Sequence, residues 1–278
     1  MHEQLETLES MAPGLIGHLS DVNGVEGVVL GGSRARGAHS PSSDFDLGIY
    51  YRSPLDTAAV QAIATRYSEV DSHATEPGGW GPWMDGGAWL TIQGVQVDFI
   101  YRNVDRVESV WIDCQQGRFS NEIQAGHPLG FWSHTYAGEL ALAVPAAELS
   151  DELAELKSAV AVYPDALSDS LVAALWEATF STVIARKAID RLDVAYVAGC
   201  LFRAAGVTAH ALHGHGRQWL LNEKGAMKSS AKMPAAPDNF ETRVAAAFQA
   251  LGPDRLSLES ACRIMDDLVN EAAKRTAR

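Results

Sequence analysis

The chain has few cysteines and no long hydrophobic run. Its 278 residues include 3 cysteines, which are widely separated and lack Cys-x-x-Cys spacing. An odd number at such spacing argues against a disulfide framework and against a cysteine-based zinc site. No apolar run approaches the roughly 20 residues that a membrane helix needs, and acidic residues follow Met1 where a secretory signal carries basic ones. We therefore expect a cytoplasmic protein without a membrane partner.

Basic residues are also scarce. Lys and Arg total 22 against 35 Asp and Glu, which gives a formal net charge of -13. Binding long nucleic acid requires many cationic contacts with phosphates, and the sequence has no Lys or Arg run to supply them. An acidic surface attracts cations instead, which fits a polyamine-like or aminoglycoside-like small molecule, although acidity can also serve solubility alone. Long nucleic acid is therefore disfavoured as a partner.

The hydrophobic pattern predicts two kinds of domain. With 47% hydrophobic residues the chain can bury a substantial core. The expected strands span residues 25–30, 45–51, 70–74, 88–92 and 95–101, and the expected helices span residues 4–19, 54–67 and 104–114. From residue 151 onward, alanine is frequent and apolar residues recur at helical spacing. We predict an α+β domain with a small mixed sheet flanked by helices over residues 1–147, followed by an all-α helical bundle over residues 148–278.

The end of the first predicted strand has the composition of a phosphate-binding turn. A β-branched run ends at Leu30 and is followed by Gly31, Gly32 and Ser33. The two glycines permit a tight turn, and backbone amides at the start of a helix can bind an anionic phosphate. Gly32 and Ser33 are therefore candidate phosphate-binding residues, and we add Arg36 of the same segment.

Three aspartates are candidate metal ligands. Asp44 and Asp46 flank Phe45, so alternation along a strand directs both carboxylates to one face and Phe45 to the other. Adjacent carboxylates repel unless a cation lies between them, and hard oxygen ligands suit Mg²⁺. Asp98 lies within an apolar segment, where a charge is costly unless it is paired or metal-bound. We predict that Asp44, Asp46 and Asp98 bind metal and act in catalysis.

The ordered set of Gly32-Ser33, Asp44-Phe45-Asp46 and Asp98 resembles the signature of the nucleotidyltransferase superfamily. This superfamily includes DNA polymerase β and the aminoglycoside and lincosamide nucleotidyltransferases. The resemblance covers the chain up to Asp98. It implies two Mg²⁺ ions, ATP as the nucleotide donor, and a helical partner domain that helps to bind the triphosphate and the acceptor.

Three residues of the helical half are further candidates. Lys187 lies four residues before Arg191, so the two can share a helix face and meet a triphosphate, or form an ordinary solvated face. The resemblance implies a lysine near the β- and γ-phosphates, a role for Lys187 or Lys224; alternatively, Lys224 and Gly225 end a helix. Glu177 is a candidate base for the acceptor hydroxyl, with a buried salt bridge as the alternative.

Residues 76–89 combine glycines and prolines with three tryptophans. Regular structure is disfavoured there, yet tryptophans are costly to leave in water, so the segment is expected to fold over something. It is either a lid over the acceptor or an ordered loop that packs its own aromatics on the sheet. Its acids, Glu76 and Asp85, can serve as a general base or bind a cationic acceptor.

The combined prediction is metal-dependent transfer of AMP from ATP to a hydroxyl of a small, aminoglycoside-like molecule, with release of pyrophosphate. One alternative is adenylylation of a protein or a tRNA, as in toxin-antitoxin nucleotidyltransferases. Another is nucleotide binding without catalysis, which the complete aspartate set opposes. The sequence leaves open the identity of the acceptor, the preferred nucleotide and the oligomeric state. A homodimer is one of the possible oligomeric states.

Overall fold

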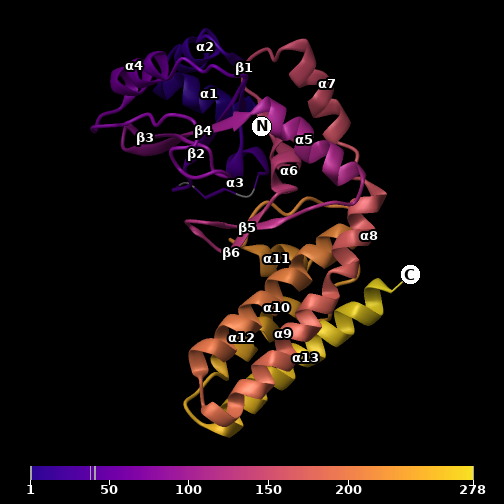
Figure 1. The fold of residues 1–278 in the computed structure, drawn as a ribbon. Helices are drawn as coiled ribbons and strands as arrows, with labels where there is room; N and C mark the ends of the chain where they lie inside the picture. The colour runs from indigo at the N-terminus through magenta and orange to yellow at the C-terminus, as the bar shows by residue number, and fades with distance from the viewer. Residues whose placement is uncertain (1, 38, 41, 278) are drawn as a thin grey trace. The chain divides into compact units, whose positions relative to one another are not determined.

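The computed structural model describes residues 2–37, 39–40 and 42–277 and divides into two compact units (Figure 1). The sheet unit comprises Met1–Ile112 and Ser120–Val162, and the helical unit comprises Asp113–Phe119 and Tyr163–Arg278. The main division therefore falls between residues 162 and 163, whereas the sequence placed it between 147 and 148. The difference is α7 (Asp151–Val160), which is counted with the sheet unit although its composition is that of the helical half.

The sheet unit contains a mixed sheet, as the sequence predicted, and its five strands lie in the order β3-β4-β2-β1-β7. The strands are β1 (Val25–Leu30), β2 (Phe45–Tyr51), β3 (Gly87–Ile92), β4 (Val95–Asn103) and β7 (Val144–Pro145). β2 and β4 are parallel, and the other neighbours are antiparallel. The predicted hairpin joins β3 to β4 through Gln93 and Gly94, which both have left-handed backbone conformations. Alternation and turn chemistry thus gave β1 to β4 and the turn correctly, whereas β7 was not predicted.

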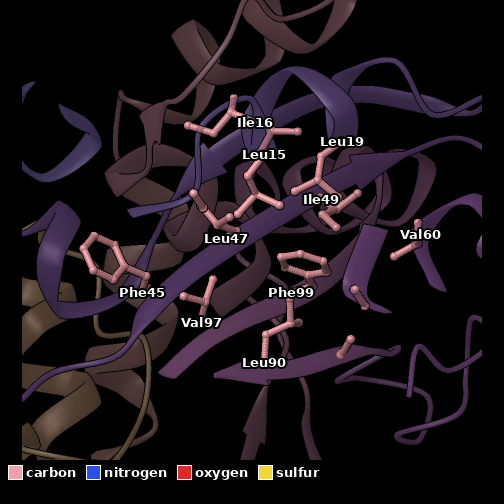
Figure 2. Close-up of a cluster of buried hydrophobic side chains, with 14 of the residues drawn as sticks. Leu15, Ile16, Leu19, Phe45, Leu47, Ile49, Val60, Leu90, Val97 and Phe99 are labelled. Carbon is pink, nitrogen blue, oxygen red and sulfur yellow. The ribbon is translucent and has the colours of Figure 1, made fainter. Parts of the chain in front are cut away.

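One face of this sheet carries the hydrophobic core. Phe45, Leu47 and Ile49 of β2 are buried and lie in register with apolar residues of β1 and β4. Three helices pack on this face: α1 (His2–Met11), α2 (Leu15–Ser20) and α4 (Thr57–Tyr67). Figure 2 shows Leu15 and Leu19 of α2 among the side chains of β2 and β4. Because side chains alternate along each strand, the opposite face receives the intervening polar residues.

Two local predictions need correction. Residues 70–74, all described, form no strand; instead the Gln61 side chain donates to the Ser72 carbonyl at 2.9 Å and accepts from the Ala74 amide at 2.8 Å. A side chain thus satisfies backbone groups that a strand partner would have satisfied. Helix α4 begins at Thr57, three residues after Pro54, because the Asp56 carboxylate accepts from the Ala59 amide and caps it.

The sheet unit has further elements, all but one of which follow β4. They are α5 (Val104–Gln115), which continues into the helical unit, the hairpin of β5 (Asn121–Gln124) and β6 (His127–Trp132), α6 (Thr135–Leu142), and α3 (Gly32–Ala35) between β1 and β2. Helix α6 is almost entirely buried and directs Glu139 and Tyr136 toward residues of β2 and β4.

The helical unit consists of helices, as predicted. They are α8 (Asp165–Ala173), α9 (Leu175–Ala188), the 3₁₀ helix η1 (Ile189–Arg191), α10 (Val194–His215), α11 (Ala226–Ser230), α12 (Phe240–Gln249) and α13 (Arg255–Thr276). Among the described residues, α10 alone is long and apolar enough to cross a membrane by length and composition. More than half of its most apolar window is buried in the structure, against α8, α9 and α13, so packing within the unit accounts for its hydrophobicity.

Candidate active site

The glycine loop after β1 is fastened to the strand that carries Asp46. The Gly31 amide donates to the Asp46 carbonyl at 2.8 Å. Gly32 follows with a left-handed backbone, φ 60°, and a Cβ atom placed on it would lie 1.7 Å from Oδ2 of Asp46. Only glycine permits both this conformation and this approach of the carboxylate. The predicted phosphate loop and the predicted metal ligand are therefore in direct contact.

Asp46 and Asp98 are neighbours on the face of the sheet opposite the core. They occupy the same register position of the parallel strands β2 and β4, and both are half-buried. Adjacent strands are separated by about 4.8 Å, so the two side chains emerge side by side. Paired carboxylates of this kind fit a divalent cation, because Mg²⁺ in proteins commonly takes one or two carboxylates and completes its shell with water and substrate phosphates.

Asp44 lies outside this pair. It precedes β2, is exposed, and its carbonyl accepts a hydrogen bond from Nε of Arg34 at 3.1 Å. Within residues 2–37, 39–40 and 42–277, no three His, Cys, Asp or Glu side chains are grouped so that they could hold one metal ion. The structure thus brings together two of the three predicted ligands and does not gather the third with them.

A buried arginine that we did not predict fixes the start of β2. The Arg34 guanidinium lies 3.8 Å from the centre of the Phe45 ring and donates to the Ser43 carbonyl from Nε at 3.0 Å and from Nη2 at 2.5 Å. Burial lowers the pKa of Arg34, while Asp44 and Asp46 act to raise it. Arg36, the residue that the sequence favoured, is exposed, and its Nε donates back to the Gly32 carbonyl at 3.0 Å. Ser33 is half-buried at the start of α3.

A second arginine that we did not predict lies further along the strands, on the same face of the sheet as Asp46 and Asp98. Arg102 of β4 is 2% exposed and donates from Nε and Nη2 to the two carboxylate oxygens of Glu139, at 2.5 and 2.9 Å. Burial lowers the pKa of Arg102, but the Glu139 carboxylate outweighs it and raises that pKa above its ordinary value. Burial likewise raises the pKa of Tyr50, its register partner on β2. The cost of burying a charge, which identified Asp98, applies equally to Arg102 and could have identified it.

The tryptophan-rich segment is an ordered loop that packs its own aromatics, as one of the two predicted alternatives had it. Trp80 stacks on Trp89 of β3 with ring centres 4.4 Å apart and an angle of 14° between the planes. Trp83 stacks on Phe131 of β6 with centres 5.6 Å apart. Its acids have structural partners: Asp85 accepts from the Tyr51 hydroxyl at 2.9 Å, and Glu76 accepts from the Thr57 hydroxyl at 2.5 Å.

The other predicted site residues belong to the helical unit. Glu177 of α9 accepts hydrogen bonds from Arg203 at 2.5 and 3.1 Å, which is the predicted salt-bridge alternative. Lys187 is exposed near the end of α9, and the chain changes to the 3₁₀ helix η1 before Arg191, so the two are not four residues apart on one α-helix. The roles proposed for Glu177 and Lys187 stay predictions.

Lys224 is exposed, and its amide donates to the Asn222 side chain at 2.9 Å. Gly225 has the left-handed backbone that we predicted, but it precedes α11 and does not end a helix. The helix-ending alternative was therefore wrong, because α10 already stops at His215. The phosphate-binding role of Lys224 stays a prediction.

One comparison with known proteins, that with family models, agrees with the motif. Residues 14–106 match the family model described as a nucleotidyltransferase domain. No curated protein matches the sequence. Among solved structures the chain is similar to the nucleotidyltransferase-like protein from Exiguobacterium sibiricum 255-15, at 13% sequence identity and a TM-score of 0.36, over 99% of this chain and 78% of that one. The range matched by the family model includes Gly32, Asp46 and Asp98.

Proposed function

We propose that the protein transfers AMP from ATP to a hydroxyl of a small molecule, because residues 14–106 match the family model of a nucleotidyltransferase domain. The acceptor oxygen forms a bond to the α-phosphorus of ATP. The bond between the α-phosphorus and the bridging oxygen breaks, and pyrophosphate leaves with the electron pair. The hydroxyl proton passes to a base.

The observation that carries this proposal is the pairing of Asp46 with Asp98 beside the glycine loop. Phosphoryl transfer requires little covalent chemistry from the protein and depends on positioning and on neutralisation of charge. Two half-buried carboxylates at matching register positions of adjacent strands provide one side of such a site. The loop from Gly31 to Ser33, in contact with Asp46, provides the other.

Asp46 and Asp98, with Asp44 two residues before Asp46 in the sequence, would hold Mg²⁺. Mg²⁺ held by these residues would neutralise charge on the triphosphate and would lower the pKa of the acceptor hydroxyl. The protein itself would contribute the backbone amides around Ser33 as donors to phosphate oxygens. Arg34 keeps the backbone at Ser43 and Asp44 in place, and so sets where β2 and its carboxylate begin.

A small cationic acceptor fits the charge of the chain better than a nucleic acid. The formal net charge of -13 repels the phosphates of a long nucleic acid and attracts amines. We infer an aminoglycoside-like acceptor in a cytoplasmic enzyme.

The test is release of pyrophosphate from each ribonucleoside triphosphate with Mg²⁺, in the presence and absence of aminoglycosides and lincosamides. We expect release from ATP that an acceptor stimulates and that Asp46→Asn and Asp98→Asn each reduce by at least about 100-fold, because each loses a charge that the transition state requires. Exchanging the paired, exposed Asp113 for Asn on α5 is the matched control and should leave release unchanged.

Turnover that persists in Asp46→Asn would contradict this mechanism. Radiolabel from ATP that appears on a protein band in lysate, with none on small molecules, would support the alternative of protein adenylylation. Label on tRNA would support the other macromolecular alternative and oppose the argument from charge.

A further inference from the structure

We propose that Trp80 and Trp89 form an aromatic platform that binds a ring of the acceptor, a hydroxylated ring carrying ammonium groups. This inference rests on the proposed function, because it names the part of the site that receives the acceptor. The observation that carries it is that the exposed indole of Trp89, stacked on the half-buried indole of Trp80, stands in the same row of the sheet as the two aspartates.

Strand register defines that row. Asp46 of β2 is paired with Asp98 of β4, and Asp98 is paired with Trp89 of β3. Residues at matching register on adjacent strands direct their side chains to the same face. Asp46, Asp98 and Trp89 therefore stand side by side on the face opposite the core. Trp89 is 60% exposed, which is unusual for the largest apolar side chain.

The order of residues along this row indicates that the acceptor, and not ATP, contacts the indoles. The glycine loop continues from β1 and lies against Asp46, and the strands then follow in the order β2, β4, β3. From one side to the other, the row reads phosphate loop, Asp46, Asp98, Trp89. In an in-line displacement the attacking oxygen and the leaving pyrophosphate lie on opposite sides of the α-phosphorus. With the phosphates at the loop, the acceptor approaches from the side of Asp98 and Trp89.

Backbone hydrogen bonds and the space at Gly87 support the position of Trp80 in the platform. The Trp80 carbonyl accepts from Nε2 of Gln124 at 2.7 Å, and the Trp80 amide donates to the Asp85 carbonyl at 3.0 Å. Gly87 gives the second indole room, because a Cβ atom there would lie 2.9 Å from a ring carbon of Trp80 and 1.8 Å from the Phe99 carbonyl oxygen. A prearranged aromatic surface binds with little loss of side-chain entropy.

Aromatic rings next to carboxylates select a particular chemistry. The face of an indole attracts ammonium groups through its π electrons and packs against the apolar face of a saturated ring. The carboxylates of Asp46 and Asp98 favour the same positive charge. A flat, neutral or anionic acceptor would use only one of these features, whereas an aminated sugar ring uses both.

The experiment compares Trp89→Ala with wild type, using kanamycin A as a cationic amino-sugar probe and calorimetry to measure its binding to the full chain. We expect the Kd for kanamycin A to rise roughly tenfold in Trp89→Ala, and Trp89→Phe to recover most of the loss. The Kd for ATP with Mg²⁺ should change less than twofold. Trp176→Ala is the matched control, because Trp176 is 67% exposed in the helical unit and should change neither value.

Each outcome decides the inference. An unchanged Kd for kanamycin A in a Trp89→Ala variant that still binds ATP overturns it, and so does failure of the wild type to bind kanamycin A. A rise in the Kd for ATP instead would assign the indoles to the nucleotide base and also overturn it. If kanamycin A binds through Trp89 but no AMP is transferred to it, the platform stands and the proposed transfer reaction fails.

Discussion

Replacement of Gly32 by alanine tests the contact between the glycine loop and Asp46. The added Cβ would lie 1.7 Å from Oδ2 of Asp46, whereas ordinary contact begins near 3.4 Å, so the carboxylate must move by about 1.7 Å. Misplacement of a reacting group by about 1 Å can reduce a rate by about 100-fold. We therefore expect Gly32→Ala to lose at least that factor in pyrophosphate release.

The matched control is Gly37→Ala. Gly37 has nearly the same left-handed backbone, with φ 65° against 60° for Gly32, but a Cβ atom placed on it meets nothing within 4 Å. Both variants therefore incur a similar backbone strain of about 1–2 kcal/mol. That strain corresponds to a fall in Tm of roughly 2–8 °C. Only Gly32→Ala also displaces the carboxylate.

The assay combines pyrophosphate release at saturating ATP with thermal unfolding of both variants. Similar Tm values, with turnover lost in Gly32→Ala alone, would assign the loss to the position of Asp46. If Gly32→Ala retains turnover within a few fold of Gly37→Ala, the contact is not needed for catalysis and the reasoning is refuted. Equal loss in both variants would attribute the effect to strain in the loop.

The buried ion pair of Arg102 with Glu139 and the buried hydroxyl of Tyr136 give further predictions. Glu139→Gln leaves the Arg102 guanidinium buried without its counter-charge, so we expect the free energy of unfolding, measured with urea, to fall by about 3–5 kcal/mol. Asp113→Asn breaks the exposed pair of Arg118 and Asp113 in the same way and should lower the free energy of unfolding by less than about 1 kcal/mol. Burial raises the pKa of Tyr136 to about 12, so the folded state holds this proton more tightly than the unfolded state does. Stability from this group is complete below about pH 10 and is lost as the pH rises toward 12. Between pH 9 and 11 the free energy of unfolding should therefore fall by about 1 kcal/mol less in Tyr136→Phe than in wild type, and an identical fall would contradict this assignment.

Sequence alone was sufficient where local rules determine the structure. Alternation placed Phe45 in the core and Asp46 on the other face, and Gln93-Gly94 gave the hairpin that brings Trp89 opposite Asp98. The parts that it missed depend on contacts between residues far apart in the chain. Gln61 replaces a strand partner for residues 72–74, and Arg34 is held at the start of β2.

In the site, too, some features follow from local sequence and others from contacts between residues far apart in the chain. The motif predicted the chemistry of the Asp46 and Asp98 pair, but only strand register shows that they are neighbours and that Trp89 completes the row. Nothing in the spacing of Asp44 distinguishes it from Asp46, because both lie on the same side of an ideal strand. Asp44 precedes β2, where the backbone is held by Arg34 and no longer follows strand alternation.

The parallel pairing of β2 with β4 also has a consequence for how the protein acquires activity. Antiparallel hairpins such as β3 and β4 close over a two-residue turn, whereas β2 and β4 meet only after α4 and the whole tryptophan-rich loop have been placed between them. Pairing across such a sequence separation incurs the loop-closure entropy first and is intrinsically slow. The two aspartates therefore become neighbours in a late step of folding, and we expect a refolding chain to regain hairpin structure before it regains turnover.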